Sequence, residues 1–215
     1  MLEFLRKHLF LLSISILIII YTVGITLIIT TDANSKIVEL TPFTILLTTF
    51  LLLLNQNQWT INIIYSLVAV FLLGLLIEII GVNTGFPFGE YSYSEILGIH
   101  IFQTPILIGI NWLMLVYAAV LTLHTYMLNV WKKAVLAGLI LVSLDVFIEP
   151  VAIGWGMWTW KTSSVPIQNY VTWGLAAIIF SLILSWKLEK TDSNKMAPVV
   201  LMLQFIFFVI LGLCG

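Results

Sequence analysis

Residues 132–153, KKAVLAGLILVSLDVFIEPVAI, form an apolar run about as long as a bilayer is thick, and this run contains two carboxylates. A helix rises about 1.5 Å per residue, so such a run can cross the hydrocarbon core of a membrane. Asp145 and Glu149 would lie on one face of that helix, about 6 Å apart along its axis. An ionisable group in hydrocarbon is unfavourable unless it pairs, loses its charge or meets water, so these acids indicate a functional site.

The rest of the chain has the composition of an integral membrane protein. Of its 215 residues, 61% are apolar and 9% are charged, and the mean hydropathy is +1.12. Apolar runs between turn residues and charges predict helices near 8–30, 41–54, 59–80, 102–125, 132–153, 170–187 and 197–213. The predicted fold is an all-α polytopic membrane helix bundle of about seven transmembrane helices, in a single integral membrane domain, residues 1–215.

The basic residues predict the orientation of this bundle. With the N-terminus in the cytoplasm, only Lys36 and Lys161 of the nine lysines and arginines fall outside. This asymmetry agrees with the positive-inside rule, and seven crossings place the C-terminus outside. We expect the chain to reside in a bacterial inner (plasma) membrane.

Several functional classes fit the sequence poorly. The single cysteine, Cys214, cannot form an internal disulfide or a cysteine metal cluster. A net charge of -1 argues against nucleic-acid binding. His8, His100 and His124 are separated in sequence and in predicted depth, so we expect no metal site. The expected partners are membrane lipid and a lipid-soluble molecule. The oligomeric state stays unknown.

A third carboxylate, Glu78, lies near the outer end of the third predicted helix. The predicted topology brings it to the same side as Asp145 and Glu149, so we expect the three to share a pocket between the third, fourth and fifth helices. Gly74 and Gly81 flank Glu78 at helical spacing, which allows a neighbouring helix or a flat ligand to approach closely.

Two outer segments, 81–101 and 154–169, combine glycine, proline, aromatic and polar residues, and we expect them to cover this pocket. Pro150 follows Glu149 and removes a backbone donor, so the helix should kink or end beside the acid. Aromatic faces in these segments can shield a cation. Belts of aromatic residues at the membrane surface give the same pattern, so both readings stay open.

Several motifs between residues 78 and 173 resemble those of the membrane carotenoid hydratases of the CruF type. The similar motifs are Glu78-Ile79-Ile80-Gly81-Val82-Asn83-Thr84-Gly85, Pro87-Phe88-Gly89, Tyr91 with Tyr93, Pro105, Asn111-Trp112, Tyr117, Asp145 with Glu149-Pro150, Trp158 with Trp160, and Val165-Pro166 with Asn169 and Trp173. The resemblance covers about residues 74–175. Ser164 and Thr172 stand where the family has glycine.

This resemblance implies a cofactor-independent hydro-lyase, a carotenoid 1,2-hydratase. It would add water to the terminal isoprenoid double bond of an acyclic carotenoid end group and form a tertiary alcohol. Glu78, Asp145 and Glu149 would be catalytic: a carboxylic acid protonates the alkene, and a remaining carboxylate activates water. The substrate would be lycopene-like or γ-carotene-like. The implied substrate contacts are Asn83, Tyr91, Tyr93, Trp112, Trp155, Trp158, Trp160, Asn169 and Trp173.

Three alternatives use the same buried acids differently. A carotenoid cyclase begins with the same protonation, but an internal double bond captures the cation. A non-catalytic carotenoid or lipid carrier would leave the polyene unchanged. A proton-coupled transporter would use the acids as a relay, although the chain lacks repeated broken helices. Hydration adds one water to the product mass, whereas cyclisation adds none.

Overall fold

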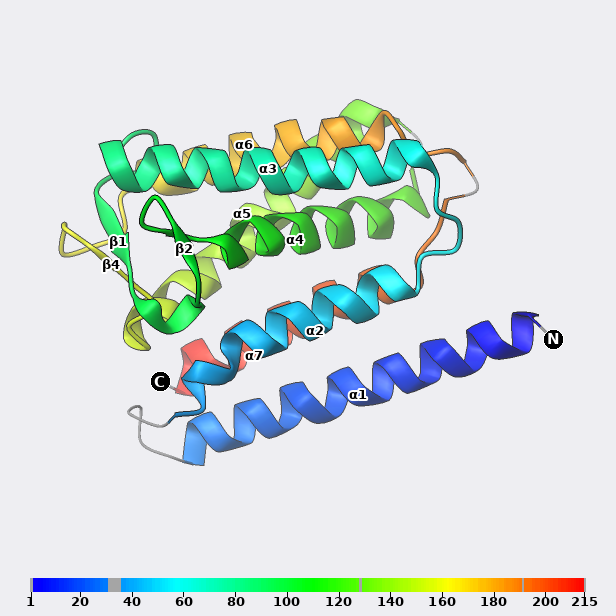
Figure 1. Ribbon diagram of the computed structural model, residues 1–215, viewed down its shortest axis with the longest axis horizontal. Coiled ribbons are helices and arrows are strands. Elements are labelled where there is room, and N and C mark those ends of the chain that lie inside the picture. The colour runs from blue at the N-terminus through cyan, green and yellow to red at the C-terminus, as the bar shows by residue number, and fades with distance from the viewer. Residues whose placement is uncertain (1, 31–35, 128, 191, 215) are drawn as a thin grey trace.

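Seven α-helices lie with their axes roughly parallel in the computed structural model, which describes residues 2–30, 36–127, 129–190 and 192–214 (Figure 1). The helices are α1 (Leu2–Thr30), α2 (Thr41–Leu54), α3 (Ile61–Thr84), α4 (Ile106–His124), α5 (Val130–Gly154), α6 (Ile167–Ser185) and α7 (Met196–Cys214). Two short 3₁₀ helices, η1 and η2, span Val38–Leu40 and Glu95–Leu97. The strands are β1 (Tyr91–Tyr93), β2 (His100–Ile101), β3 (Thr104–Pro105) and β4 (Trp158–Trp160).

The predicted all-α membrane bundle is confirmed. Six of the helices are long and apolar enough to cross a membrane, while the apolar segment Val38–Leu54 is shorter. The two ends of the chain lie at opposite ends of the bundle (Figure 1). Which end faces the cytoplasm stays a prediction from the basic residues.

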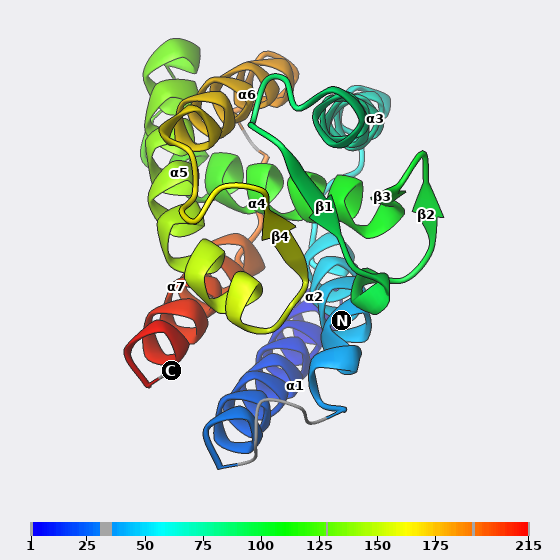
Figure 2. The same ribbon diagram turned by 90° about the vertical axis from the view of Figure 1, so that its left-hand side faces the viewer.

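Helix α4 occupies the centre of the bundle (Figure 2) and contributes more buried core residues than any other helix. Of the residues in its most apolar 18-residue segment, 72% are buried. The small residues Ala118 and Ala119 of this helix are fully buried. Small side chains let neighbouring helices approach closely, which suits packing within a membrane. Helix α1 is much more exposed, because only 17% of the residues in its most apolar 18-residue segment are buried. It packs mainly against α7.

The helix boundaries differ from the predicted ranges by up to six residues, and two differences affect the candidate site. Helix α3 continues to Thr84 and ends where Gly85 takes a φ of 73°, a left-handed conformation that favours glycine at a helix end. Asn83 is therefore helical rather than part of an outer loop. Helix α5 passes through Pro150 and continues to Gly154, so the helix does not end beside Glu149.

The two outer segments join as a two-stranded antiparallel ribbon across one end of the bundle (Figure 2). Tyr91 pairs with Trp160 and Tyr93 pairs with Trp158. Side chains alternate between the two faces of a strand, so these four aromatic residues share one face. Ser92 is exposed on the other face. The ribbon therefore brings an aromatic layer over the end of the helices.

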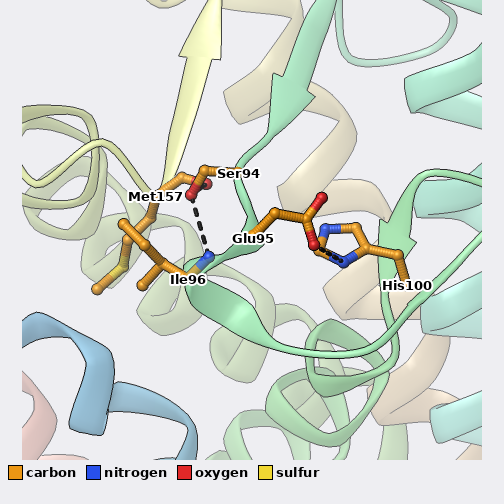
Figure 3. Close-up of polar contacts among 5 residues, drawn as sticks. All are labelled: Ser94, Glu95, Ile96, His100 and Met157. Carbon is orange, nitrogen blue, oxygen red and sulfur yellow. Dashed lines mark hydrogen bonds and ion pairs between the residues drawn. The ribbon is translucent and has the colours of Figure 1, made fainter.

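A short connection after β1 fixes the ribbon to the segment that follows α5 (Figure 3). The Ser94 backbone N–H donates to the Met157 carbonyl at 3.0 Å, and the Ser94 hydroxyl donates to the same oxygen at 3.3 Å. The Ser94 hydroxyl also accepts from the Ile96 N–H at 3.4 Å, which caps η2. These bonds hold the two outer segments together beyond the ribbon itself.

Candidate active site

Three carboxylates converge on one cavity under the ribbon. Glu78, Asp145 and Glu149 are 2%, 2% and 3% exposed, and all three line a cavity of about 350 Å³. The predicted convergence is confirmed. The walls include more of the fold than predicted, because α1, α2, α6 and α7 contribute residues in addition to α3, α4 and α5.

Glu78 accepts three hydrogen bonds from separate parts of the chain. The Tyr91 and Tyr93 hydroxyls donate to Glu78 Oε2 at 2.7 and 2.9 Å, and the Trp112 indole N–H donates to Oε1 at 3.1 Å. Three donors around one carboxyl group suit a negatively charged carboxylate.

The two tyrosines on β1 are held in their protonated form. Burial raises the pKa of the Tyr91 and Tyr93 phenols, and the negative charge of Glu78 raises both further. A protonated phenol can donate a hydrogen bond, whereas a phenolate cannot. Both tyrosines therefore act as donors to Glu78.

Glu149 is also surrounded by donors. The indole N–H groups of Trp158 and Trp160 both donate to Glu149 Oε2 at 3.0 Å. The Asn169 side-chain amide donates to Glu149 Oε1 at 3.1 Å. The ribbon strand β4 and the first turn of α6 thus both contact this acid.

Asn169 connects the two acids of α5. Its amide nitrogen also donates to Asp145 Oδ2 at 3.2 Å. Asp145 receives this bond alone from the described part of the chain, whereas Glu149 receives three. Asp145 and Glu149 therefore form a pair that shares one neutral donor and differs in hydrogen bonding.

Aromatic rings enclose this cluster. The Tyr91 and Trp160 rings lie 4.9 Å apart, and the Tyr93 and Trp158 rings lie 5.9 Å apart in an edge-on arrangement. Trp173 lines the cavity and stacks on Trp112 with ring centroids 3.9 Å apart. The cluster is thus screened from solvent by rings whose faces can attract a cation.

The opposite side of the cavity is apolar. Helices α1, η1, α2 and α7 contribute side chains such as Ile19, Val23, Val38, Phe43, Phe207 and Phe208. Phe207 contacts the Tyr21 ring at 5.4 Å and the Trp155 ring at 6.3 Å, which makes the wall continuous from α1 to the end of α5. This half of the cavity suits a long hydrocarbon chain.

Most of the predicted substrate contacts line this cavity. They are Tyr91, Tyr93, Trp155, Trp158, Trp160, Asn169 and Trp173. Trp112 lies behind the cavity wall, fully buried, and holds Glu78. Asn83 is exposed and lies outside the cavity lining. Its amide donates to the Ile79 and Phe102 carbonyls at 2.8 and 2.9 Å. The continuation of α3 to Thr84 explains this position.

Five polar residues that line the cavity were not assigned to it from the sequence: Tyr21, Thr41, Thr44, Asn111 and Gln204. The Gln204 amide donates to the Tyr21 hydroxyl at 2.8 Å, which lies 3.2 Å from the Thr48 hydroxyl. A glutamine inside the apolar run of α7 was the available signal, since polar side chains in spanning helices usually find partners on other helices. Asn111 was noticed only as part of the resemblance.

The carboxylates of the cavity are not arranged as a metal site in the part of the chain that the structure describes. No group of three or more histidine, cysteine, aspartate or glutamate side chains there could hold a metal ion. His100 lies outside the cavity lining, and its Nδ1 is 3.6 Å from a carboxylate oxygen of Glu95 (Figure 3). The independence from metals and cofactors stays a prediction.

A sequence model of the carotenoid biosynthesis protein family matches residues 40–214, a range that includes all three carboxylates. The chain belongs to this family. This membership agrees with the resemblance noted within residues 74–175. Thr172, which replaces a glycine in that resemblance, donates from its hydroxyl to the Pro87 carbonyl at 3.1 Å and so ties α6 to the segment before β1.

A curated relative provides a second comparison. The chain is 29% identical over 146 residues to a bisanhydrobacterioruberin hydratase of Haloarcula japonica, an alignment that covers 60% of this chain and 47% of that protein. The chain thus spans about half the length of the relative. No solved structure matches the chain.

Proposed function

We propose that this chain is a carotenoid hydratase that adds water to the terminal isoprenoid double bond of an acyclic carotenoid end group. The observation that carries the proposal is the meeting of three buried carboxylates in one cavity whose other half is apolar. An alkene is a weak base, so its protonation needs a carboxylic acid shielded from water. We place the reaction in the inner membrane of a bacterium, with no cofactor required.

Asp145 is the proton donor in this proposal. Glu78 and Glu149 each accept three hydrogen bonds, so their surroundings favour negative charge. Asp145 accepts one, from Asn169. Two carboxyl groups held close together can share a single proton. The donors around Glu149 favour negative charge on Glu149, so the proposal assigns the proton to Asp145.

Protonation creates a tertiary carbocation. The Asp145 proton bonds to the less substituted alkene carbon, and the electron pair of the double bond forms that C–H bond. The positive charge on the other carbon is stabilised by the faces of cavity aromatics such as Trp173 and by the nearby negative charge of Glu149.

Water then captures the cation. The water oxygen bonds to the tertiary carbon while one of its protons passes to Glu149, giving the tertiary alcohol. The proton on Glu149 returns to Asp145, which lies one helical turn away on the same face of α5. The pair thus recovers its starting state, and the sum of the steps is alkene plus water.

The remainder of the polyene lies against the apolar wall formed by α1, α2 and α7. A lycopene-like or γ-carotene-like molecule offers an acyclic end for the acids and a long hydrocarbon chain for this wall. The aligned relative is named a bisanhydrobacterioruberin hydratase, so the lycopene-like or γ-carotene-like substrate belongs to this proposal.

Expression in cells that accumulate lycopene or γ-carotene tests the function. A hydratase yields a more polar pigment whose mass has increased by one water. A cyclase changes the pigment without changing its mass, and a carrier leaves it unaltered, so either result contradicts the proposal. An anaerobic reaction in oxygen-18-labelled water should place the heavy isotope in the alcohol. In a separate aerobic reaction, incorporation of label from oxygen-18-labelled dioxygen would show a hydroxylase.

A further inference from the structure

Asn111 is a polar side chain of the cavity with an unusual environment. It lies on α4, is partly buried and lines the same cavity as the acids. The other cavity asparagine, Asn169, donates to two carboxyl groups. Within the described ranges, no side chain or backbone group forms a hydrogen bond with the Asn111 amide.

An amide without a partner is unfavourable inside a membrane. Neither lipid nor apolar side chains can accept its protons, so such a group within the hydrocarbon depth is stable mainly beside water or a polar ligand. A small cavity with polar walls can hold an ordered water that makes two to four hydrogen bonds. The Asn111 amide therefore indicates a water site.

Asn111 shares its cavity with the proposed reacting groups. Trp112, the next residue of α4, donates to Glu78, and Asn111 itself lines the cavity that holds the three acids. Ile108, one turn earlier, lines the cavity as well. A carboxamide has both an acceptor oxygen and two N–H donors, so it can orient a water through either of its hydrogen-bonding roles.

We propose that Asn111 binds the water molecule that attacks the carbocation. This inference rests on the proposed function and adds a positioning residue to it. The amide oxygen accepts one O–H of the water, the other O–H is directed to a carboxylate, and a lone pair of the water oxygen faces the cationic carbon.

Positioned water decides between two fates of the cation. In one fate, the water oxygen bonds to the tertiary carbon and a water proton passes to a carboxylate. In the other, a carboxylate removes a proton from an adjacent carbon, and the electrons of that C–H bond re-form an alkene. Loss of the bound water slows the first fate and leaves the second open.

Turnover in heavy water measures both fates together. Protonation by a deuterated acid followed by proton loss leaves deuterium in recovered carotenoid, while capture by water gives the deuterated alcohol. In Asn111→Leu, we expect alcohol formation to fall about tenfold or more, the size expected for loss of one or two hydrogen bonds. Deuterium in recovered carotenoid should persist, so the ratio of exchange to hydration rises.

Two further variants complete the test. Asn111→Ser keeps a smaller hydrogen-bonding group and should give an intermediate ratio, even if the leucine variant inserts poorly. Asn62→Leu replaces an exposed asparagine at the far end of α3 and should behave as wild type.

The outcomes separate this inference from the proposed function. An unchanged ratio of exchange to hydration in both Asn111 variants would overturn the water site, because a general packing defect lowers both processes equally. A wild-type protein that forms neither alcohol nor deuterated carotenoid would overturn the hydratase proposal itself, and the water site with it.

Discussion

Trp112 fills the space that a side chain at residue 74 would occupy. A Cβ atom on Gly74 would lie 2.7 Å from the Cβ atom of Trp112, which is too close for two carbon atoms. The same tryptophan donates to Glu78 and stacks on Trp173. The close approach of α3 to α4 at this glycine therefore sets the position of one catalytic candidate and of one cavity wall.

Replacement of this glycine should disturb the acid without touching it. In Gly74→Ala, the added methyl group meets the first atoms of the Trp112 side chain, which cannot rotate away from the helix. We expect turnover to fall about tenfold and stability to fall by about 1–3 kcal/mol, as for other overpacked sites. Turnover and thermal unfolding measure the two effects.

Gly154→Ala is the matched control for this substitution, because a Cβ there would have no neighbour within 4 Å. It should leave both quantities near wild type. Equal turnover in Gly74→Ala and wild type would show that the contact between α3 and α4 does not set the position of Glu78.

The α5 pair should be essential for chemistry. Asp145→Asn and Glu149→Gln keep the side-chain volume but cannot deliver or accept the proton. We expect each to lower turnover by about 10²–10⁴, the usual contribution of a general acid or base, while membrane insertion is retained. Product formation in membranes and the amount of inserted protein measure both.

Glu95→Gln serves as the control for these amides, since Glu95 is exposed and lies outside the cavity lining. It should hydrate at the wild-type rate. Activity close to wild type in both Asp145→Asn and Glu149→Gln would remove acid catalysis by this pair.

The helices and the meeting of the acids could be predicted from the sequence for physical reasons. An apolar run long enough to cross a bilayer forms a helix whatever its neighbours are, because lipid leaves its backbone no other partner. A carboxylate within such a run needs polar partners or water nearby. Glu78, Asp145 and Glu149 all lie toward the C-terminal ends of their helices, so they could be expected to meet.

The exact helix ends could not be predicted as well. The sequence near Asn83 contains glycines on both sides, and either glycine could begin a turn. The structure uses Gly85 and keeps Gly81 inside the helix, where a Cβ would collide with Phe88 and Tyr91. Only the packing of the ribbon distinguishes the two glycines, and it moves Asn83 away from the site.

The polar contact between α1 and α7 could not be predicted from the sequence either. Tyr21 and Gln204 lie in the first and last helices, and hydropathy does not say which helices become neighbours. The same limit applies to Trp112, whose role as a donor to Glu78 depends on how closely α3 and α4 approach.

The tryptophans of β4 offer a way to separate hydrogen bonding from cation stabilisation. Trp158→Phe or Trp160→Phe keeps an aromatic face but removes an N–H that donates to Glu149 Oε2. A hydrogen bond to a charged group contributes about 1.5–3 kcal/mol, so each variant should lose about tenfold or more in turnover. Leucine at either position should lose more, because the ring face also disappears.

Trp131→Phe, at an exposed tryptophan in the first turn of α5, is the control and should keep wild-type turnover. Equal losses for phenylalanine and leucine at Trp158 and Trp160 would contradict a role for the aromatic face.

Alkaline titration tests the donors to Glu78. Burial and the charge of Glu78 raise the pKa of Tyr91 and Tyr93 above the usual value of about 10, so both stay protonated in the folded protein there. The unfolded chain releases these protons first, so their contribution to stability declines as the pH rises above about 10. The double variant Tyr91→Phe and Tyr93→Phe should show the same phenolate absorbance rise as folded wild type.

A smaller rise in the Tyr91 and Tyr93 double variant would show that these phenols ionise in the folded state and do not remain donors to Glu78.

Asn169 should matter more than its neutral side chain suggests. In Asn169→Leu, the pair on α5 loses its common donor, and two acids one helical turn apart are left with less stabilisation of charge. Protonation of both acids then becomes more favourable, which removes the base that accepts the proton from water. We expect turnover to fall by about 10–100-fold, and raising the pH should restore part of it, because an ionised carboxylate returns.

Asn169→Asp adds a third negative group to the pair and should be at least as damaging. The pH profile of turnover for both variants, compared with that of wild type, tests this prediction. If the leucine variant lost the same fraction of turnover at every pH, Asn169 would contribute to packing and not to the charge of the pair.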